Sequence, residues 1–243
     1  MRVAAVLLAL ASFAACAQDY EREKRWAEQV VPNLVSGDAV QLRLPAGREF
    51  LGIYTEAQKA RAAVLLVHGV GVHPDHGIIG ILRASLAEAG YTTLSIQMPV
   101  QASDAKLDDY YPKVFPEAVQ RISAGARWLK EKGAGRVVLL SHSMGSWMSN
   151  VYYEETAEPP FAAWVCLGLT GGYGGMGNVR VPVLDIYGEN DLPPVLRADR
   201  RRRMTIGGID GSSQMKIAGA DHHYLGKEKE LAAAIHEFIG KLK

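Results

Sequence analysis

Three residues whose side chains cooperate in nucleophilic catalysis follow apolar runs of this chain, in the order Ser143, Asp191 and His222. A serine becomes a strong nucleophile when a histidine takes its proton, and a carboxylate orients that histidine and stabilises its charged form. Asp191 follows the apolar run 181–187, and His222 follows the short run 215–217. We therefore interpret the three as a candidate nucleophile, orienting acid and general base.

The candidate nucleophile lies in the pentapeptide SHSMG, residues 141–145. Residues 137–141 are typical of a strand buried on both faces, and residues 143–153 contain no proline and carry bulky side chains at helical spacing. A serine at such a sharp strand-to-helix turn is a nucleophile elbow, usually written G-x-S-x-G. Ser141 replaces the first glycine here, and Gly145 retains the second. Whether this replacement reduces activity stays open.

The sequence leaves an alternative for each partner of the serine. Glu189 lies in the same turn as Asp191, and His223 directly follows His222. We favour Asp191 because it stands immediately before the turn Leu-Pro-Pro, and His222 because it directly follows the turn Gly-Ala-Asp. Glu189 and His223 remain the alternatives.

A glycine-rich segment, HGVGVHPDHG at residues 68–77, follows the apolar run 62–67. Such a turn brings backbone N–H groups to the edge of a sheet, as an oxyanion hole requires. We assign the hole to the backbone N–H groups of Val70 and Met144. The segment lacks the spacing and the Lys-Ser/Thr ending of a phosphate-binding loop. His73 and His76 could suggest a metal, but surface loop histidines are common, so we expect no metal at this segment.

The elements that must position these residues alternate between strands and helices, which favours an α/β fold with a doubly wound, mostly parallel sheet. An N-terminal antiparallel hairpin, residues 39–44 and 49–54, brings the sheet to about eight strands. In such sheets ligands bind at the carboxyl ends of the strands. The expected strands are 62–67, 91–98, 137–141, 162–167, 181–187 and 215–217, and the expected helices are 77–89, 116–132, 195–205 and 227–242.

Four motifs, LLVHGVG, LLSHSMGS, VPVLDIYGENDLP and GADHHY, resemble those of the α/β-hydrolase superfamily in their order and in their placement after strands. The segment from HGVGVHPDHG to SIQMP further resembles a poorly characterised subgroup of exported bacterial α/β-hydrolases. The resemblance implies a serine hydrolase, carboxylesterase-like, that cleaves a carboxylic ester or thioester through an acyl-enzyme intermediate, without a cofactor. Its substrate would be a small-molecule or lipid-like ester.

The resemblance also leaves other functions open. An amide is a less favoured substrate, and a catalytically silent binding or assembly protein of the bacterial envelope is the alternative from another class. A dehalogenase would more often carry aspartate at the elbow. Residues 170–180 are too few for a sizeable cap domain, so we expect substrate contacts from 101–115 and from 73–76. Within the first range, Asp108, Asp109, Tyr110 and Tyr111 either border the site or form a solvated loop, and we slightly favour the loop.

Composition argues for one globular domain, since 48% of the 243 residues are hydrophobic and 22% are charged. The formal net charge of +1 gives no global attraction to nucleic acid, and none is expected as a partner. One local charge cluster lies within the expected helix 195–205, at Arg197 and at Arg200 to Arg203. A solvated face is the ordinary interpretation of such a run, and contact with anionic lipid headgroups or with an acidic partner in the envelope is the sharper hypothesis.

The first residues have the pattern of a secretory signal peptide: a basic start at Arg2, an apolar run over 3–15 and a charged segment after Gln18. Ala15-Cys16-Ala17 fits cleavage before Gln18, whereas residues 13–16 resemble a lipobox that would place a lipid on Cys16. We expect residues 1–17 to be the signal, 18–37 a tether and 38–243 the hydrolase domain. The protein is then exported, either periplasmic or lipid-anchored. Cys166, inside an apolar run, is expected to be a buried thiol.

Overall fold

The computed structural model describes residues 18–106, 113–170, 174 and 178–242, and within them the strands form one eight-stranded sheet. The strand order is β1-β2-β4-β3-β5-β6-β7-β8. β1 pairs antiparallel with β2 and β2 antiparallel with β4, whereas the pairings from β4 through β3 to β8 are parallel. The strands are β1 (Asp38–Arg43), β2 (Glu49–Thr55), β3 (Ala63–Val67), β4 (Thr92–Ile96), β5 (Val137–His142), β6 (Ala163–Leu167), β7 (Val183–Asn190) and β8 (Ser213–Asp221).

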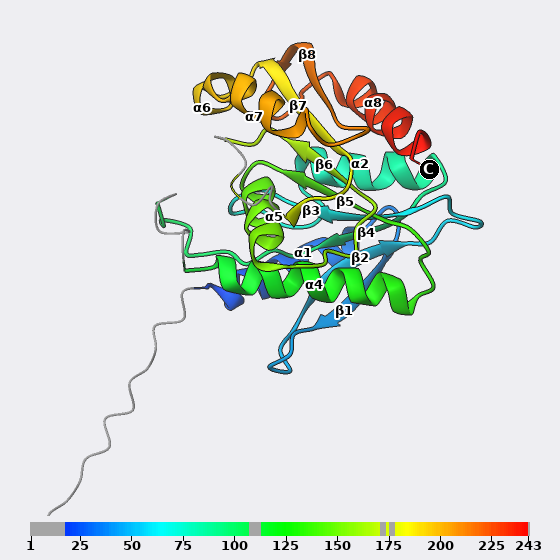
Figure 1. Cartoon of the computed structure of the whole chain (residues 1–243). Coiled ribbons are helices and arrows are strands. Elements are labelled where there is room, and N and C mark those ends of the chain that lie inside the picture. The colour runs from blue at the N-terminus through cyan, green and yellow to red at the C-terminus, as the bar shows by residue number, and fades with distance from the viewer. Residues whose placement is uncertain (1–17, 107–112, 171–173, 175–177, 243) are drawn as a thin grey trace, which may run out of the picture.

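Helices cover both faces of this sheet, as Figure 1 shows. Successive residues of a strand point to opposite faces, so Leu65 and Val67 enter one apolar core while Val64 and Leu66 enter the other. The first core includes residues of α4 and α5, and the second includes residues of α2 and α8. The helices are α1 (Tyr20–Val30), the 3₁₀ turn η1 (Val31–Asn33), α2 (Gly77–Glu88), α4 (Phe115–Glu131), α5 (Met144–Glu155), α6 (Pro193–Arg197), α7 (Asp199–Ile206) and α8 (Glu228–Gly240).

The structure confirms the predicted fold class, including the N-terminal hairpin and the strands expected around the site. The last strand is longer than predicted: β8 spans Ser213–Asp221, not only residues 215–217. β8 lies at the edge of the sheet and exposes polar residues such as Lys216, so it lacks the continuous apolar run of a central strand.

The arginine cluster differs from the prediction, because Arg202 is buried and does not belong to a solvated surface. Its Nε donates to both carboxylate oxygens of Asp185 in β7, at 3.1 and 3.0 Å, and its Nη1 donates to the carbonyls of Leu169 and Val195 at 2.9 Å each. A carboxylate inside a buried strand requires such a partner. Residues 193–206 also form two helices, α6 and α7, where one was expected.

The segment expected as a tether, residues 18–37, contains helix α1, which begins after Asp19. The Asp19 carboxylate caps the helix by accepting from the N–H of Arg22 at 2.8 Å. The expected signal peptide lies outside the described residues, so its cleavage or lipidation stays a prediction. No helix within the described ranges combines the length and hydropathy needed to cross a membrane.

Candidate active site

The elbow at Ser143 is a strained turn between β5 and α5. Ser143 has φ 57° and ψ −121°, a region that non-glycine residues rarely occupy. Its N–H donates to the carbonyl of Leu167 at the end of β6, at 2.9 Å. A Cβ at Gly145 would lie 2.5 Å from the carbonyl oxygens of both Val67 and His68, so only glycine fits there. The close approach of α5 to β3 therefore depends on this one glycine.

Ser143, His222 and Asp191 lie in hydrogen-bonding contact. His222 Nε2 is 2.9 Å from Ser143 Oγ, and His222 Nδ1 is 2.6 Å from Asp191 Oδ1. The three residues follow β5, β8 and β7, whose carboxyl ends meet at one edge of the sheet. His222 and Asp191 are buried, while Ser143 is partly exposed and can meet a ligand. This geometry suits transfer of the serine proton to the histidine.

The environment of Asp191 keeps its carboxylate charged. Burial alone would raise its pKa, but the hydrogen bond and charge of His222 oppose this, together with the backbone N–H groups of Gly188 and Leu192. The net effect holds the pKa of Asp191 below its ordinary value. A carboxylate held in this way fixes the Nδ1–H tautomer of His222 and leaves Nε2 free to accept a proton.

The two alternative residues are directed elsewhere. Glu189 is exposed; it accepts from the N–H of Gly219 at 2.9 Å and lies 3.6 Å from the ammonium of Lys216. His223 is also exposed, and its backbone N–H donates to the carboxylate of Asp221. Within the described residues, the hydrogen bonds that Ser143 and Asp191 make to another side chain are with His222. The structure thus brings together Ser143, His222 and Asp191, and it places Glu189 and His223 outside this set of contacts.

The glycine-rich segment lies against the elbow, because a Cβ placed on Gly69 would be 3.3 Å from the Cβ of Ser143. His68 fixes this segment from inside. Its Nε2 accepts from the N–H of Met98 at 2.8 Å, so its Nδ1–H donates to the carbonyl of Gly69 at 2.8 Å. In a trans peptide the C=O and N–H point in opposite directions, so this bond also orients the N–H of Val70.

Burial keeps His68 neutral by lowering its pKa to about 3. The neutral ring can accept from Met98 and donate to Gly69 at once, which a charged ring, with two donors, could not. His68 was not among the residues predicted for the site, although a histidine at the buried end of a strand was the available signal.

A second buried histidine, His142, was also missed. Its Nε2–H donates to the backbone carbonyl of His222 at 2.9 Å, so it links the elbow to the loop that carries the candidate base. Burial lowers the pKa of His142 to about 4, and the nearby His222 acts in the same direction. The backbone of Gly168 lies close to the His222 ring, since a Cβ on Gly168 would be 2.9 Å from Cε1 of His222.

The departure from the elbow motif has a structural reason. Ser141 is fully buried, and its Oγ accepts from the indole N–H of Trp164 in β6 at 2.9 Å. A glycine at this position would offer no acceptor to that side chain. The side chain of Ser141 thus forms a hydrogen bond between the neighbouring strands β5 and β6.

His73 and His76, which were considered for metal binding, lie in aromatic contacts. His73 packs against Trp26 with ring centroids 5.9 Å apart, and against His76 at 5.4 Å. No group of three or more His, Cys, Asp or Glu side chains suited to a metal occurs in the part of the chain that the structure describes. The stretch Asp108–Tyr111, weighed as either a border of the site or a solvated loop, lies outside that part.

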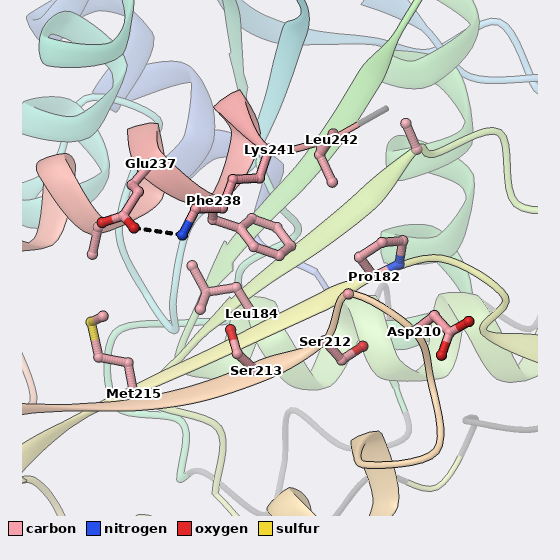
Figure 2. A pocket seen from close by; sticks show the side chains of 13 residues that line it. Pro182, Leu184, Asp210, Ser212, Ser213, Met215, Glu237, Phe238, Lys241 and Leu242 are labelled. Atoms are coloured by element: carbon pink, nitrogen blue, oxygen red, sulfur yellow. Dashed lines mark hydrogen bonds and ion pairs between the residues drawn. The ribbon is translucent and has the colours of Figure 1, made fainter.

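A cavity of about 640 Å³ lies away from this site, near the amino ends of β6, β7 and β8. Figure 2 shows Phe238 of α8 facing Leu184 of β7, with Glu237 and Lys241 joined by an ion pair nearby. Pro182 and Ser212, which also line the cavity, precede β7 and β8. Because Ser143 lies at the carboxyl ends of the strands, this cavity does not lead to it.

The chain was compared with known sequence families and with curated proteins. Residues 3–119 match a sequence family described as "Protein of unknown function (DUF3530)". No curated protein matches the chain.

Solved structures resemble it over most of its length. Dienelactone hydrolase from Anabaena variabilis is 20% identical with a TM-score of 0.70, and covers 85% of this chain and 98% of its own. Est1E from Butyrivibrio proteoclasticus is 15% identical with a TM-score of 0.65, and covers 85% and 99%. An α/β serine hydrolase without a lid from Xanthomonas campestris is 15% identical with a TM-score of 0.63, and covers 86% and 95%. At these identities the likeness shows the fold.

Replacing Ser141 tests its structural role. Ser141→Ala and Ser141→Gly both remove the acceptor of the Trp164 bond, and we expect each to lower the free energy of unfolding by about 1–3 kcal/mol. Urea denaturation followed by circular dichroism measures this loss. Ser141→Thr, which keeps the hydroxyl, is the matched variant for the hydrogen bond. Glycine and alanine variants as stable as the wild type would contradict the assignment.

His142 predicts a pH dependence of stability. Its pKa is about 4 in the folded protein against an ordinary 6.5, so between these values the unfolded chain binds a proton that the folded protein does not. The free energy of unfolding therefore falls as pH drops through this window, by about 1.4 kcal/mol per pH unit from this residue. His142→Gln should show a correspondingly smaller slope in urea denaturation at pH 4.5–7. Equal slopes would show that His142 does not titrate as inferred.

Proposed function

The chain has the α/β-hydrolase fold, and on that premise we propose that it is a serine hydrolase that cleaves a carboxylic ester through Ser143, His222 and Asp191. The observation that carries the proposal is the pair of hydrogen bonds from His222, 2.9 Å to Ser143 Oγ and 2.6 Å to Asp191 Oδ1, at a strained elbow. Similar structures that include an esterase from Pyrococcus furiosus and the dienelactone hydrolase agree with it.

The first half of the reaction forms an acyl-enzyme. His222 Nε2 takes the hydroxyl proton of Ser143 as Oγ attacks the ester carbonyl carbon. The negative charge that develops on the carbonyl oxygen is stabilised by the N–H groups of Val70 and Met144. The tetrahedral species then collapses, the C–O bond to the alcohol breaks, and His222 donates its proton to the departing oxygen.

The second half releases the acid. A water molecule gives a proton to His222 and attacks the acyl carbon, and the second tetrahedral species collapses with return of the proton to Ser143. Asp191 stays charged throughout, which its lowered pKa favours, and stabilises the imidazolium in both halves. The same steps apply to a thioester, whose leaving group is a thiolate.

The accessibility of the site supports a small or lipid-like ester as substrate. Only residues 168–182 separate β6 from β7, and this is too short for a sizeable cap domain. Ser143 is partly exposed, so an acyl chain could approach from solvent or from a surface.

Loss of Ser143 should abolish turnover. We expect Ser143→Ala to lower kcat for p-nitrophenyl esters by at least about 10⁴-fold and to prevent labelling by a fluorophosphonate, since both need the nucleophile. A series of esters of increasing acyl length identifies the preferred chain. Wild-type protein that neither hydrolyses the series nor reacts with the fluorophosphonate would contradict the proposal and favour a silent binding or assembly protein.

We also propose that the protein is exported and associates with a membrane surface, through a lipid on Cys16 or through exposed arginines of α6 and α7. Arg200, Arg201 and Arg203 are exposed, and Met204, next to them, is 71% exposed. Arg197, Arg200, Arg201 and Met204 also line a shallow hollow. Positive charges around an exposed apolar side chain suit anionic lipid headgroups.

Vesicle binding tests the arginine surface. Replacing Arg200, Arg201 and Arg203 by Gln, with the buried Arg202 left in place, should weaken binding to phosphatidylglycerol vesicles roughly a hundredfold, at about 1 kcal/mol per charge. Replacing the exposed Lys130, Lys132 and Lys229 by Gln removes the same charge elsewhere and serves as control. Equal loss in both variants, or none in either, would contradict a specific surface. The intact mass of the mature protein shows whether Cys16 carries a lipid.

A further inference from the structure

Side chains in or directly after β3 and β4 bind carbonyl groups of the glycine-rich segment, residues 68–77. His68 Nδ1–H donates to Gly69 at 2.8 Å, Gln97 Nε2 donates to Val72 at 3.3 Å, and Ser95 Oγ donates to Pro74 at 2.7 Å. These donors belong to β4 or directly follow β3 or β4, so the sheet itself fixes much of the segment.

The carbonyl of Gly71 is held from a different part of the chain. It accepts from Arg22 Nη2 at 3.1 Å, and Arg22 lies in helix α1, near the start of the described chain. Arg22 Nη1 donates to the carbonyl of Gln101 at 2.8 Å. One guanidinium therefore bridges the segments after β3 and β4, and its rigid fork suits two carbonyls in a way that an ammonium does not.

Aromatic contacts reinforce this bridge. The guanidinium carbon of Arg22 lies 4.5 Å from the centroid of the Trp26 ring, one helical turn further along α1. The Trp26 ring meets the His73 ring edge-to-face at 5.9 Å. Arg22 and Trp26 thus contact the same loop at two points.

Helix α1 is itself fixed to the domain. The N–H of Asp19 donates to the carbonyl of Val100 at 2.7 Å. Glu23 forms an ion pair with the fully buried Arg121 at 3.0 Å, and Tyr20 donates to Glu117 at 2.6 Å. Arg22 therefore projects from an anchored helix. The segment expected as a tether packs directly against the loops at the candidate site.

Val70 lies between the two fixed peptide groups. On one side His68 holds the Gly69–Val70 peptide, and on the other Arg22 holds the carbonyl of Gly71. Gly71 has φ 66° and, lacking a Cβ, can change conformation at little cost. A hydrogen bond to its carbonyl therefore restrains a residue that could otherwise reorient.

We propose that Arg22 is a positioning residue of the active site, which keeps the N–H of Val70 directed at the reacting carbonyl oxygen by holding the carbonyls of Gly71 and Gln101. The proposal rests on the proposed hydrolase function. Arg22 does not touch substrate; it acts on the rate through the orientation of an oxyanion donor, and small misplacements of such donors are costly.

Three variants test this in the full chain: Arg22→Ala, Arg22→Lys and the control Arg25→Ala, whose side chain is exposed on the same helix. For a p-nitrophenyl ester we expect Arg22→Ala to lower kcat roughly ten- to a hundredfold with KM nearly unchanged. The affinity of a boronic acid that mimics the tetrahedral species should fall in proportion. Arg22→Lys should lie between Arg22→Ala and the wild type, and Arg25→Ala should match the wild type.

Hydrogen exchange separates failure of this inference from failure of the proposed function. In Arg22→Ala the amides of residues 69–76 should exchange faster, while those of β5 and α5 should not, and the melting temperature shows that each variant is folded during the assay. A wild type without turnover overturns the proposed function and the catalytic role of Arg22 with it. An active wild type with kcat and boronate affinity unchanged in Arg22→Ala overturns the inference alone, whatever the exchange shows.

Discussion

The backbone of Ser143 is the constraint on which the rest of the site depends. A non-glycine residue at φ 57° and ψ −121° costs on the order of 1–3 kcal/mol, and it persists only where the surroundings leave no other conformation. Here the N–H of Ser143 is bound to Leu167 and Gly145 lies against the backbone of Val67 and His68. Strands β3, β5 and β6 and helix α5 thus meet at one turn, and their large shared core compensates the local strain.

Two neutral histidines hold the parts of the site together. His68 joins the end of β3 to the start of the segment after β4, and His142 joins the elbow to the loop of His222. Burial lowers the pKa of both far below neutrality, so near neutral pH each keeps one donor and one acceptor. The carboxylate of Asp191 is held in its charged form by the donors around it, whereas these two buried histidines add no charge beside the reacting carbonyl.

Sequence patterns located the central strands because residues buried on both faces form continuous apolar runs, as in β3 and β6. Because Ser143, Asp191 and His222 each follow a predicted strand, they were expected together at the carboxyl ends of the strands, and the structure places them in contact there. Sequence patterns could not show long-range polar partners. The burial of Arg202 depends on Asp185, seventeen positions away, and the docking of α1 depends on Arg121, ninety-eight positions from Glu23. An aspartate inside the apolar run 181–187 was the one sequence signal that a cation had to be buried nearby.

The hydrogen bond between Ser141 and Trp164 also bears on how this chain relates to others of its fold. On β6, Trp164 lies opposite Leu139, two residues before Ser141, and its indole N–H reaches the Ser141 hydroxyl diagonally. Glycine at position 141 would remove this acceptor, and loss of the indole would leave the hydroxyl without this donor. The two positions therefore form a coupled pair across adjacent strands. In related chains they should change together, glycine accompanying an apolar residue and serine accompanying tryptophan. The presence of serine in place of the first elbow glycine would then identify a group of related chains by how two strands pack, whatever reaction those chains catalyse.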